Sequence, residues 1–213
     1  DRLYENSCIS NLTALFTFNT QYDIDLLKRA INLVLEENDG LRLRISGKSE
    51  DLENPLQYVA VYREIDPDYY DFSGSADSSE LDPWALSVAS EPFSMYDSDL
   101  FYVAVLRLPG GKTGYLLKMN HIISDGWTYK FLGEQIFEAC RRLEGGGTVI
   151  PEKNPSYMEY ISAEVEFLKS DKLDEGRRFW FDRLIPLPEE ARISMNPAPA
   201  KGINAESVTY AFS

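Results

Sequence analysis

The chain has few of the residues that bind metals or form cross-links: one histidine, His121, and two cysteines, Cys8 and Cys140, among 213 residues. The cysteines are far apart in the sequence and lack metal-ligand spacing, which argues against a zinc site and against a disulfide framework. The sequence also lacks an apolar run of the roughly 20 residues that a transmembrane helix requires. We therefore expect a cytoplasmic protein that binds neither metal nor membrane.

Basic residues are also scarce, with 21 Lys and Arg against 35 Asp and Glu, which gives a net charge of -14. Such a charge opposes binding to the phosphates of nucleic acids and to anionic lipid surfaces. Apolar residues are abundant, at 44% of the chain, and 13% of the residues are aromatic. A chain of this size and composition can bury the core of one large domain or of two small lobes.

The first hundred residues have patterns of both strands and helices. Asp23 caps a predicted helix over residues 24–37, whose apolar positions share one stripe. Residues 41–45 then alternate as a strand, which places Arg42 and Arg44 together on its polar face. The further expected segments are strands over 11–19 and 56–63, a loop over 66–79 and a short helix over 81–89.

The second half of the chain contains a predicted hairpin. Residues 100–108 and 114–119 are its strands, the turn spans 109–113, and the second strand ends at Asn120 and His121. The further expected segments are a helix from Gly126 to Gly145, a helical region over 156–184 with a break near 170–174, and a strand over 207–212. Because strands and helices mix without strict β-α-β alternation, the pattern predicts an α+β fold.

His121, Asp125 and Gly126 form the pattern His-x-x-x-Asp-Gly where a strand, a turn and a helix are predicted to meet. Imidazole is the side chain best suited to proton transfer near neutral pH, and loops held by a sheet often carry reactive groups. Asp125 also suits the N-cap of the following helix, and His121 could equally be a hydrogen-bonded residue at a strand end. Ser124 lacks the Gly-x-Ser-x-Gly turn of a nucleophile, and turn formation explains it better.

Residues 120–126 resemble the His-His-x-x-x-Asp-Gly signature of the condensation domains of nonribosomal peptide synthetases, with Asn120 in place of the first histidine. These domains lie within the wider superfamily that includes chloramphenicol acetyltransferase. Four other segments match family landmarks in the family's order, so the resemblance covers nearly the whole chain. They are residues 23–45, Glu91-Pro92-Phe93-Ser94, residues 156–160 and Arg178-Phe179-Trp180.

The resemblance implies a chloramphenicol acetyltransferase-like N-terminal lobe, a mixed β-sheet flanked by helices, over residues 1–185. Residues 186–213 would connect it to a C-terminal lobe, and the isolated lobe is expected to be inactive because the family's catalytic tunnel lies between lobes. The implied reaction is amide bond formation between a donor thioester and an acceptor amine. Both substrates would arrive on the phosphopantetheine arms of carrier protein domains, so no directly bound cofactor is expected.

The resemblance implies that His121 is the catalytic residue. It would either take a proton from the acceptor amine or position that amine. Asp125 would be structural, in a salt bridge with Arg42, and Arg44 is the reserve partner. Gly126 and Asn120 complete the expected structural residues of the site. Ester formation, epimerisation and a non-catalytic docking role toward carrier proteins stay open as alternatives.

Overall fold

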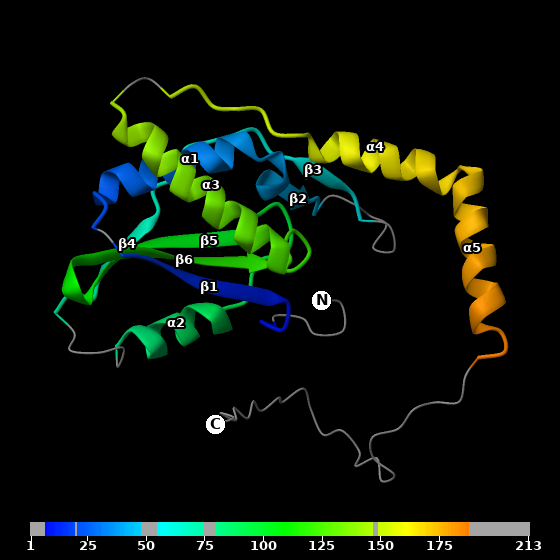
Figure 1. The fold of residues 1–213 in the computed structure, drawn as a ribbon. Helices are drawn as coiled ribbons and strands as arrows, with labels where there is room; N and C mark the ends of the chain where they lie inside the picture. Colours follow the sequence, from blue (N-terminus) through cyan, green and yellow to red (C-terminus); the bar gives the residue numbers. More distant parts are fainter. Residues whose placement is uncertain (1–6, 20, 48–54, 75–79, 147–148, 188–213) are drawn as a thin grey trace, which may run out of the picture. The chain divides into compact units, whose positions relative to one another are not determined.

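The computed structural model describes residues 7–19, 21–47, 55–74, 80–146 and 149–187 (Figure 1). The chain divides into two compact units, residues 1–162 and 163–213, and each unit is described by itself. The strand predicted over 207–212 lies outside the described residues. No helix in the described ranges is long and apolar enough to span a membrane.

Four strands form the main sheet of the first unit, in the spatial order β1-β6-β5-β4. They are β1 (Asn11–Phe18), β4 (Asp68–Asp71), β5 (Phe101–Leu108) and β6 (Lys112–Asn120). β6 pairs antiparallel with both β1 and β5, whereas β4 runs parallel to β5. The turn between β5 and β6 contains Gly110 and Gly111, whose φ angles of 71° and 72° favour glycine. β6 is therefore hydrogen-bonded along both of its edges.

Three helices cover the two faces of this sheet. They are α1 (Ile24–Glu37), α2 (Leu81–Ser90) and α3 (Gly126–Glu144). α1 and α3 pack on one face, and α2 lies on the other (Figure 1). The side chains of β6 alternate accordingly, because Tyr115, Leu117 and Met119 join the core beneath α1 and α3 while Leu116 lies beneath α2. This burial on both faces makes β6 the centre of the unit.

A second, smaller sheet lies beyond the end of α1. It pairs β2 (Leu43–Ile45) antiparallel with β3 (Gln57–Val59), and β2 follows the short 3-10 helix η1 (Asp39–Arg42). The last elements are α4 (Tyr157–Leu168), which begins in the first unit, and α5 (Asp171–Leu184), which belongs to the second.

The structure confirms the α+β class, the hairpin and the three helices of the first unit. Asp23 caps α1 as predicted, because its carboxylate accepts a hydrogen bond from the Leu26 amide at 3.0 Å. The helical region near the C-terminus also breaks, between α4 and α5, but the break lies at residues 169–170 and residues 171–174 of the predicted break belong to α5.

Three predicted segments need correction. Residues 41–45 are not one strand, because Arg42 belongs to η1 and only Leu43–Ile45 pair with β3, so Arg42 and Arg44 do not share a strand face. The strand expected over 56–63 is limited to β3. The loop expected over 66–79 contains β4, whose polar sequence becomes a strand by pairing with β5.

Gly114 tests how tightly β1 and β6 pack. A Cβ there would collide with the carbonyl oxygen of Phe16 and would lie 3.1 Å from Cδ1 of Leu108. We expect Gly114→Ala to lower the free energy of unfolding by about 1–3 kcal/mol, measured by urea denaturation. Gly74→Ala is the matched control, because a Cβ at Gly74 meets no atom within 4 Å. Equal stabilities of the two variants would contradict this packing.

Candidate active site

The end of β6 determines where His121 lies. The amide of Asn120 donates to the carbonyl of Leu100 at 2.9 Å, and the amide of His121 donates to the carbonyl of Ser10 at 2.7 Å. Asn120 is 3% exposed, whereas His121 is exposed. The strand thus carries its last residue into the core and presents the imidazole at the surface.

Asn120 organises the turn that follows the strand. Its backbone carbonyl accepts hydrogen bonds from the amide of Ile123 at 3.1 Å and from the hydroxyl of Ser124 at 3.0 Å. Its side-chain Oδ1 accepts from the amide of Ile122 at 3.0 Å, and its Nδ2 lies 3.6 Å from Sδ of Met95. Since the Ser124 hydroxyl is used inside this turn, its contacts agree with turn formation and not with a nucleophile.

The turn fixes the tautomer of His121. Nδ1 of the imidazole lies 2.7 Å from the carbonyl oxygen of Ser124. A carbonyl oxygen can only accept, so Nδ1 carries the proton and Nε2 carries the lone pair in the neutral ring. The imidazole is therefore oriented as a base through Nε2.

His121 lines a pocket of about 380 Å³ built within the first unit. Residues 121–125 form one wall, and Gly40 and Leu43 form another. Thr128 from α3 and Tyr157 from the start of α4 complete it. The sequence did not indicate Gly40, Leu43 and Tyr157 as parts of the site. Their residue types suggest no chemistry, and they are distant from His121 in the sequence.

Asp125 is the N-cap of α3. Its Oδ1 accepts hydrogen bonds from the amide and the hydroxyl of Thr128, both at 2.8 Å, and its own amide donates to that hydroxyl at 3.1 Å. The hydrogen bond from the Thr128 amide is the main cause that lowers the pKa of Asp125 below its usual value. Gly126 begins α3, and a Cβ there would meet no atom within 4 Å, so the described structure places no steric demand for glycine at this position.

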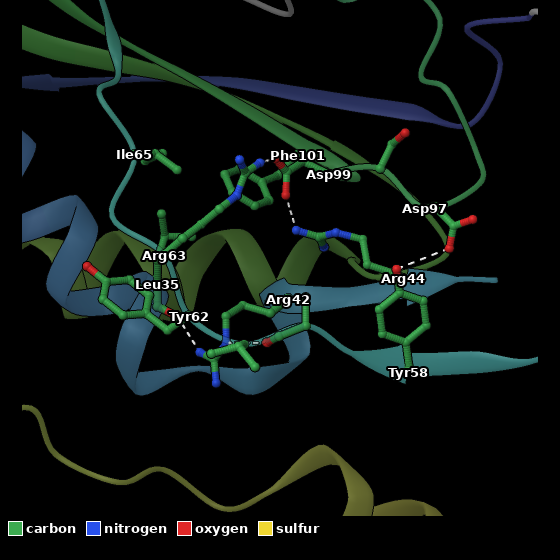
Figure 2. Close-up of a pocket in the computed structure, with 13 residues that line it drawn as sticks. Leu35, Arg42, Arg44, Tyr58, Tyr62, Arg63, Ile65, Asp97, Asp99 and Phe101 are labelled. Carbon is green, nitrogen blue, oxygen red and sulfur yellow. Dashed lines mark hydrogen bonds and ion pairs between the residues drawn. The ribbon is translucent and has the colours of Figure 1, made fainter. Parts of the chain in front are cut away.

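The predicted ion pair between Asp125 and Arg42 does not form. In the part of the chain that the structure describes, Asp125 has no ion pair, and it is exposed, so its charge needs no buried partner. Arg42 instead donates to backbone carbonyls at the end of α1 and on the segment after β3 (Figure 2). These are Leu35 at 2.6 Å, Glu36 at 2.9 Å, Asn38 at 3.2 Å and Ala60 at 3.2 Å. A cation at a helix C-terminus is stabilised by the helix dipole and by unpaired carbonyls.

Arg44, the reserve partner, pairs with Asp99 and not with Asp125 (Figure 2). Asp99 uses its other oxygen to bind Arg63 at 2.6 Å. Because Asp99 precedes Leu100, whose carbonyl holds the Asn120 amide, this ion pair ties β2 to the start of β5. Both arginines of the Leu-Arg-Leu-Arg segment therefore stabilise the scaffold around the site.

Comparison with solved structures assigns the fold. The starter condensation domain of rhizomide synthetase matches 88% of this chain with a TM-score of 0.77 at 17% identity, and the chain covers 45% of that domain. The first condensation domain of the CDA synthetase matches 91% of the chain with a TM-score of 0.76 at 20% identity, and the chain covers 49% of it. The chain therefore has the fold of about half of a condensation domain.

Comparison of sequences assigns the family. Residues 1–212 match the family model described as Condensation domain, so the chain belongs to this family. The plipastatin synthase of Bacillus subtilis (strain 168) is 30% identical over 84% of the chain. Surfactin synthase subunit 1 of the same organism is 24% identical over 97% of it. The chain spans 7% and 6% of the lengths of these two relatives.

The tautomer of His121 can be measured without ambiguity, because the chain has a single histidine. We expect ¹⁵N NMR of the imidazole at about pH 8 to show a protonated Nδ1 and an unprotonated Nε2. In Asn120→Ala the turn loses the Ile122 contact, and the preference for this tautomer should weaken. A protonated Nε2 in the unchanged protein would contradict the bond to Ser124.

A double-mutant cycle tests whether Asp125 and Arg42 interact. Asp125→Ala removes the cap and Arg42→Met removes the carbonyl contacts, so each should lower Tm by about 2–4 °C. Because the two side chains bind different partners, the losses should add to within about 1 °C in the double variant. If the double variant were no less stable than the single variants, Asp125 and Arg42 would be shown to interact as an ion pair.

The charge of the Asp125 cap predicts a pH dependence. A carboxyl whose pKa is lowered by folding stabilises the protein above its unfolded pKa, and this stabilisation is lost as pH falls through the folded pKa. The unchanged protein should therefore exceed Asp125→Asn in Tm at neutral pH and lose that advantage below about pH 4. An advantage that persists at about pH 2 would show that the charge is not responsible.

Proposed function

We propose that this chain supplies the histidine-bearing wall of a condensation site that joins a carrier-bound acyl thioester to an acceptor amine. The observation that carries the proposal is the orientation of His121, whose Nδ1 is held by the Ser124 carbonyl within the family signature. Nε2 is then the atom available to the substrates in the pocket.

The orientation supports a defined proton path. As the amine nitrogen attacks the thioester carbonyl, a C–N bond forms and Nε2 of His121 accepts a proton from that nitrogen. When the C–S bond breaks, the same proton returns to the leaving thiolate. The fixed ring also positions the amine, so general-base catalysis and positioning act through one geometry.

Asn120 supports a catalytic role over a docking role. Loss of the signature's first histidine would suggest decay of the site if the replacement left a gap. Asn120 instead is buried, and its side-chain Oδ1 accepts a hydrogen bond from the amide of Ile122 in the turn that orients His121. The replacement therefore preserves the structure that the base requires.

We further propose that residues 1–185 form one lobe and that residues 186–213 lead toward a second. The solved condensation domains are about twice as long as the part that this chain matches, which supports a second lobe as partner. The described residues of the second unit also expose large apolar side chains on α5 and just after it. They include Phe179, Trp180, Phe181, Leu184 and Ile185, each at least 42% exposed. A second lobe is the partner that we propose for this surface.

Carrier protein domains are the proposed source of both substrates. Their phosphopantetheine arms would bring the thioester and the amine to the His121 pocket, and the protein itself would hold no cofactor. Of the alternatives, ester formation and epimerisation use the same signature, and no contact of the described residues favours either of them.

The first test removes the base. In a two-lobe protein that contains this chain, His121→Ala should lower the rate of amide formation about 100- to 10,000-fold while Tm changes little, since the imidazole is exposed. Glu138→Ala, on the solvent side of α3, is the control and should retain the rate. The rate is measured by mass spectrometry of carrier-bound product. A fully active His121→Ala protein would contradict the mechanism.

The second test concerns the single lobe. The 213-residue chain should give no condensation product with carrier-bound substrates, because the pocket lacks the wall that excludes water and positions the second substrate. Addition of the separate second lobe should restore turnover. Robust turnover by the 213 residues alone would contradict the lobe assignment.

A further inference from the structure

A second cavity, of about 300 Å³, lies in the first unit on the other side of β2 from His121. Leu43 lines the His121 pocket, whereas its neighbour Arg44 lines this cavity. Successive strand residues point to opposite faces, so the two spaces are separate. Figure 2 shows Arg42, Arg44 and Arg63 around the second cavity, with Asp97 and Asp99 at one side.

The cavity has an excess of positive charge in a strongly acidic protein. Its lining holds three guanidinium groups and the two carboxylates of Asp97 and Asp99. Asp99 is shared between Arg44 and Arg63, and Asp97 accepts from the hydroxyl of Tyr58 at 3.1 Å. Arg42 binds only backbone carbonyls among the described residues. One positive charge therefore has no carboxylate partner within the lining.

Several donors of these arginines are unused. Arg44 has an 8% exposed side chain; its Nη1 binds the carbonyls of Leu41 and Leu43, and its Nη2 binds Asp99. Its Nε, like Nη2 of Arg42, meets no acceptor in the described part of the chain. Burial, together with the nearby charges of Arg63 and Arg42, lowers the pKa of Arg44 below its ordinary value.

Much of the remaining lining is apolar, although it also includes Ser98 and Tyr58. Leu35, Ile65 and Phe101 contribute side chains beside the arginines, together with the ring of Tyr62 (Figure 2). A volume of about 300 Å³ is at the lower end of cavities that bind small molecules. The cavity thus combines unused guanidinium donors with an apolar wall, which suits a ligand with one charged end.

We propose that this cavity binds a small organic oxyanion, a phosphate monoester or a carboxylate, whose apolar part lies against Leu35, Ile65 and Phe101. Guanidinium groups bind both oxyanions through paired, charge-assisted hydrogen bonds, and Asp99 already shows one carboxylate bridging two of these arginines. The proposal does not depend on catalysis by His121, because the cavity is separate from that pocket.

The test uses the intact ¹⁵N-labelled chain, titrated with phenyl phosphate, benzoate or inorganic phosphate at constant ionic strength and followed by NMR. We expect saturable shifts of the amides of Ala60, Arg63 and Asp99, with a Kd of about 1 mM or lower for phenyl phosphate or benzoate. The ligand with the lower Kd identifies the anion class, a phosphate monoester for phenyl phosphate or a carboxylate for benzoate. Inorganic phosphate should bind more weakly than phenyl phosphate, because it lacks the apolar part.

Two variants decide whether binding is specific. Arg63→Met should weaken binding about tenfold, since it removes charge-assisted hydrogen bonds at the exposed edge of the cavity. Arg141→Met is the matched control, because Arg141 is similarly exposed and paired, with Glu138, but lies on α3 away from the cavity. Shifts that fail to saturate, or equal weakening by both variants, would overturn the proposal and leave the arginines as a purely structural network.

Discussion

The pairing of β6 along both edges and its burial on both faces is the constraint on which the rest of the first unit depends. A strand in this position cannot shift by one residue without moving its apolar side chains to the wrong layer. Its end is therefore fixed, and so are the buried amide of Asn120 and the exposed imidazole of His121. The turn after β6 then needs only local hydrogen bonds to orient the base.

Two charged side chains of the scaffold, Arg42 and Arg44, stabilise the region between the two cavities. Arg42 binds the carbonyl end of α1, and Arg44 joins β2 to the segment that precedes β5 through Asp99. Both arginines line the second cavity and neither lines the His121 pocket, so their charges stabilise the scaffold without entering the pocket of the base. Asp125 also acts locally, because its carboxylate caps the N-terminus of α3.

The proposed chemistry follows from an imidazole that the turn orients and from a second lobe that, in our proposal, completes the site. Hydrogen bonding to a backbone carbonyl selects the tautomer without adding a charge, so Nε2 is presented as a base. We propose that a second lobe encloses the site, since the solved condensation domains that share this fold extend to about twice the matched length. Catalysis in our proposal therefore depends on a partner lobe, whereas the orientation of the base does not.

The sequence by itself determined the hairpin, the helices and the cap at Asp23, because these depend on local periodicity and on turn chemistry. It also indicated His121, through the spacing to Asp125 and Gly126. The sequence allowed two interpretations of Asp125, as the N-cap of α3 or as the ion-pair partner of Arg42, and it could not decide between them. Partner choice depends on distances between segments far apart in the chain. Only the tertiary structure decided that β4 pairs with β5, that the Ser124 carbonyl selects the His121 tautomer, and that three arginines surround one cavity.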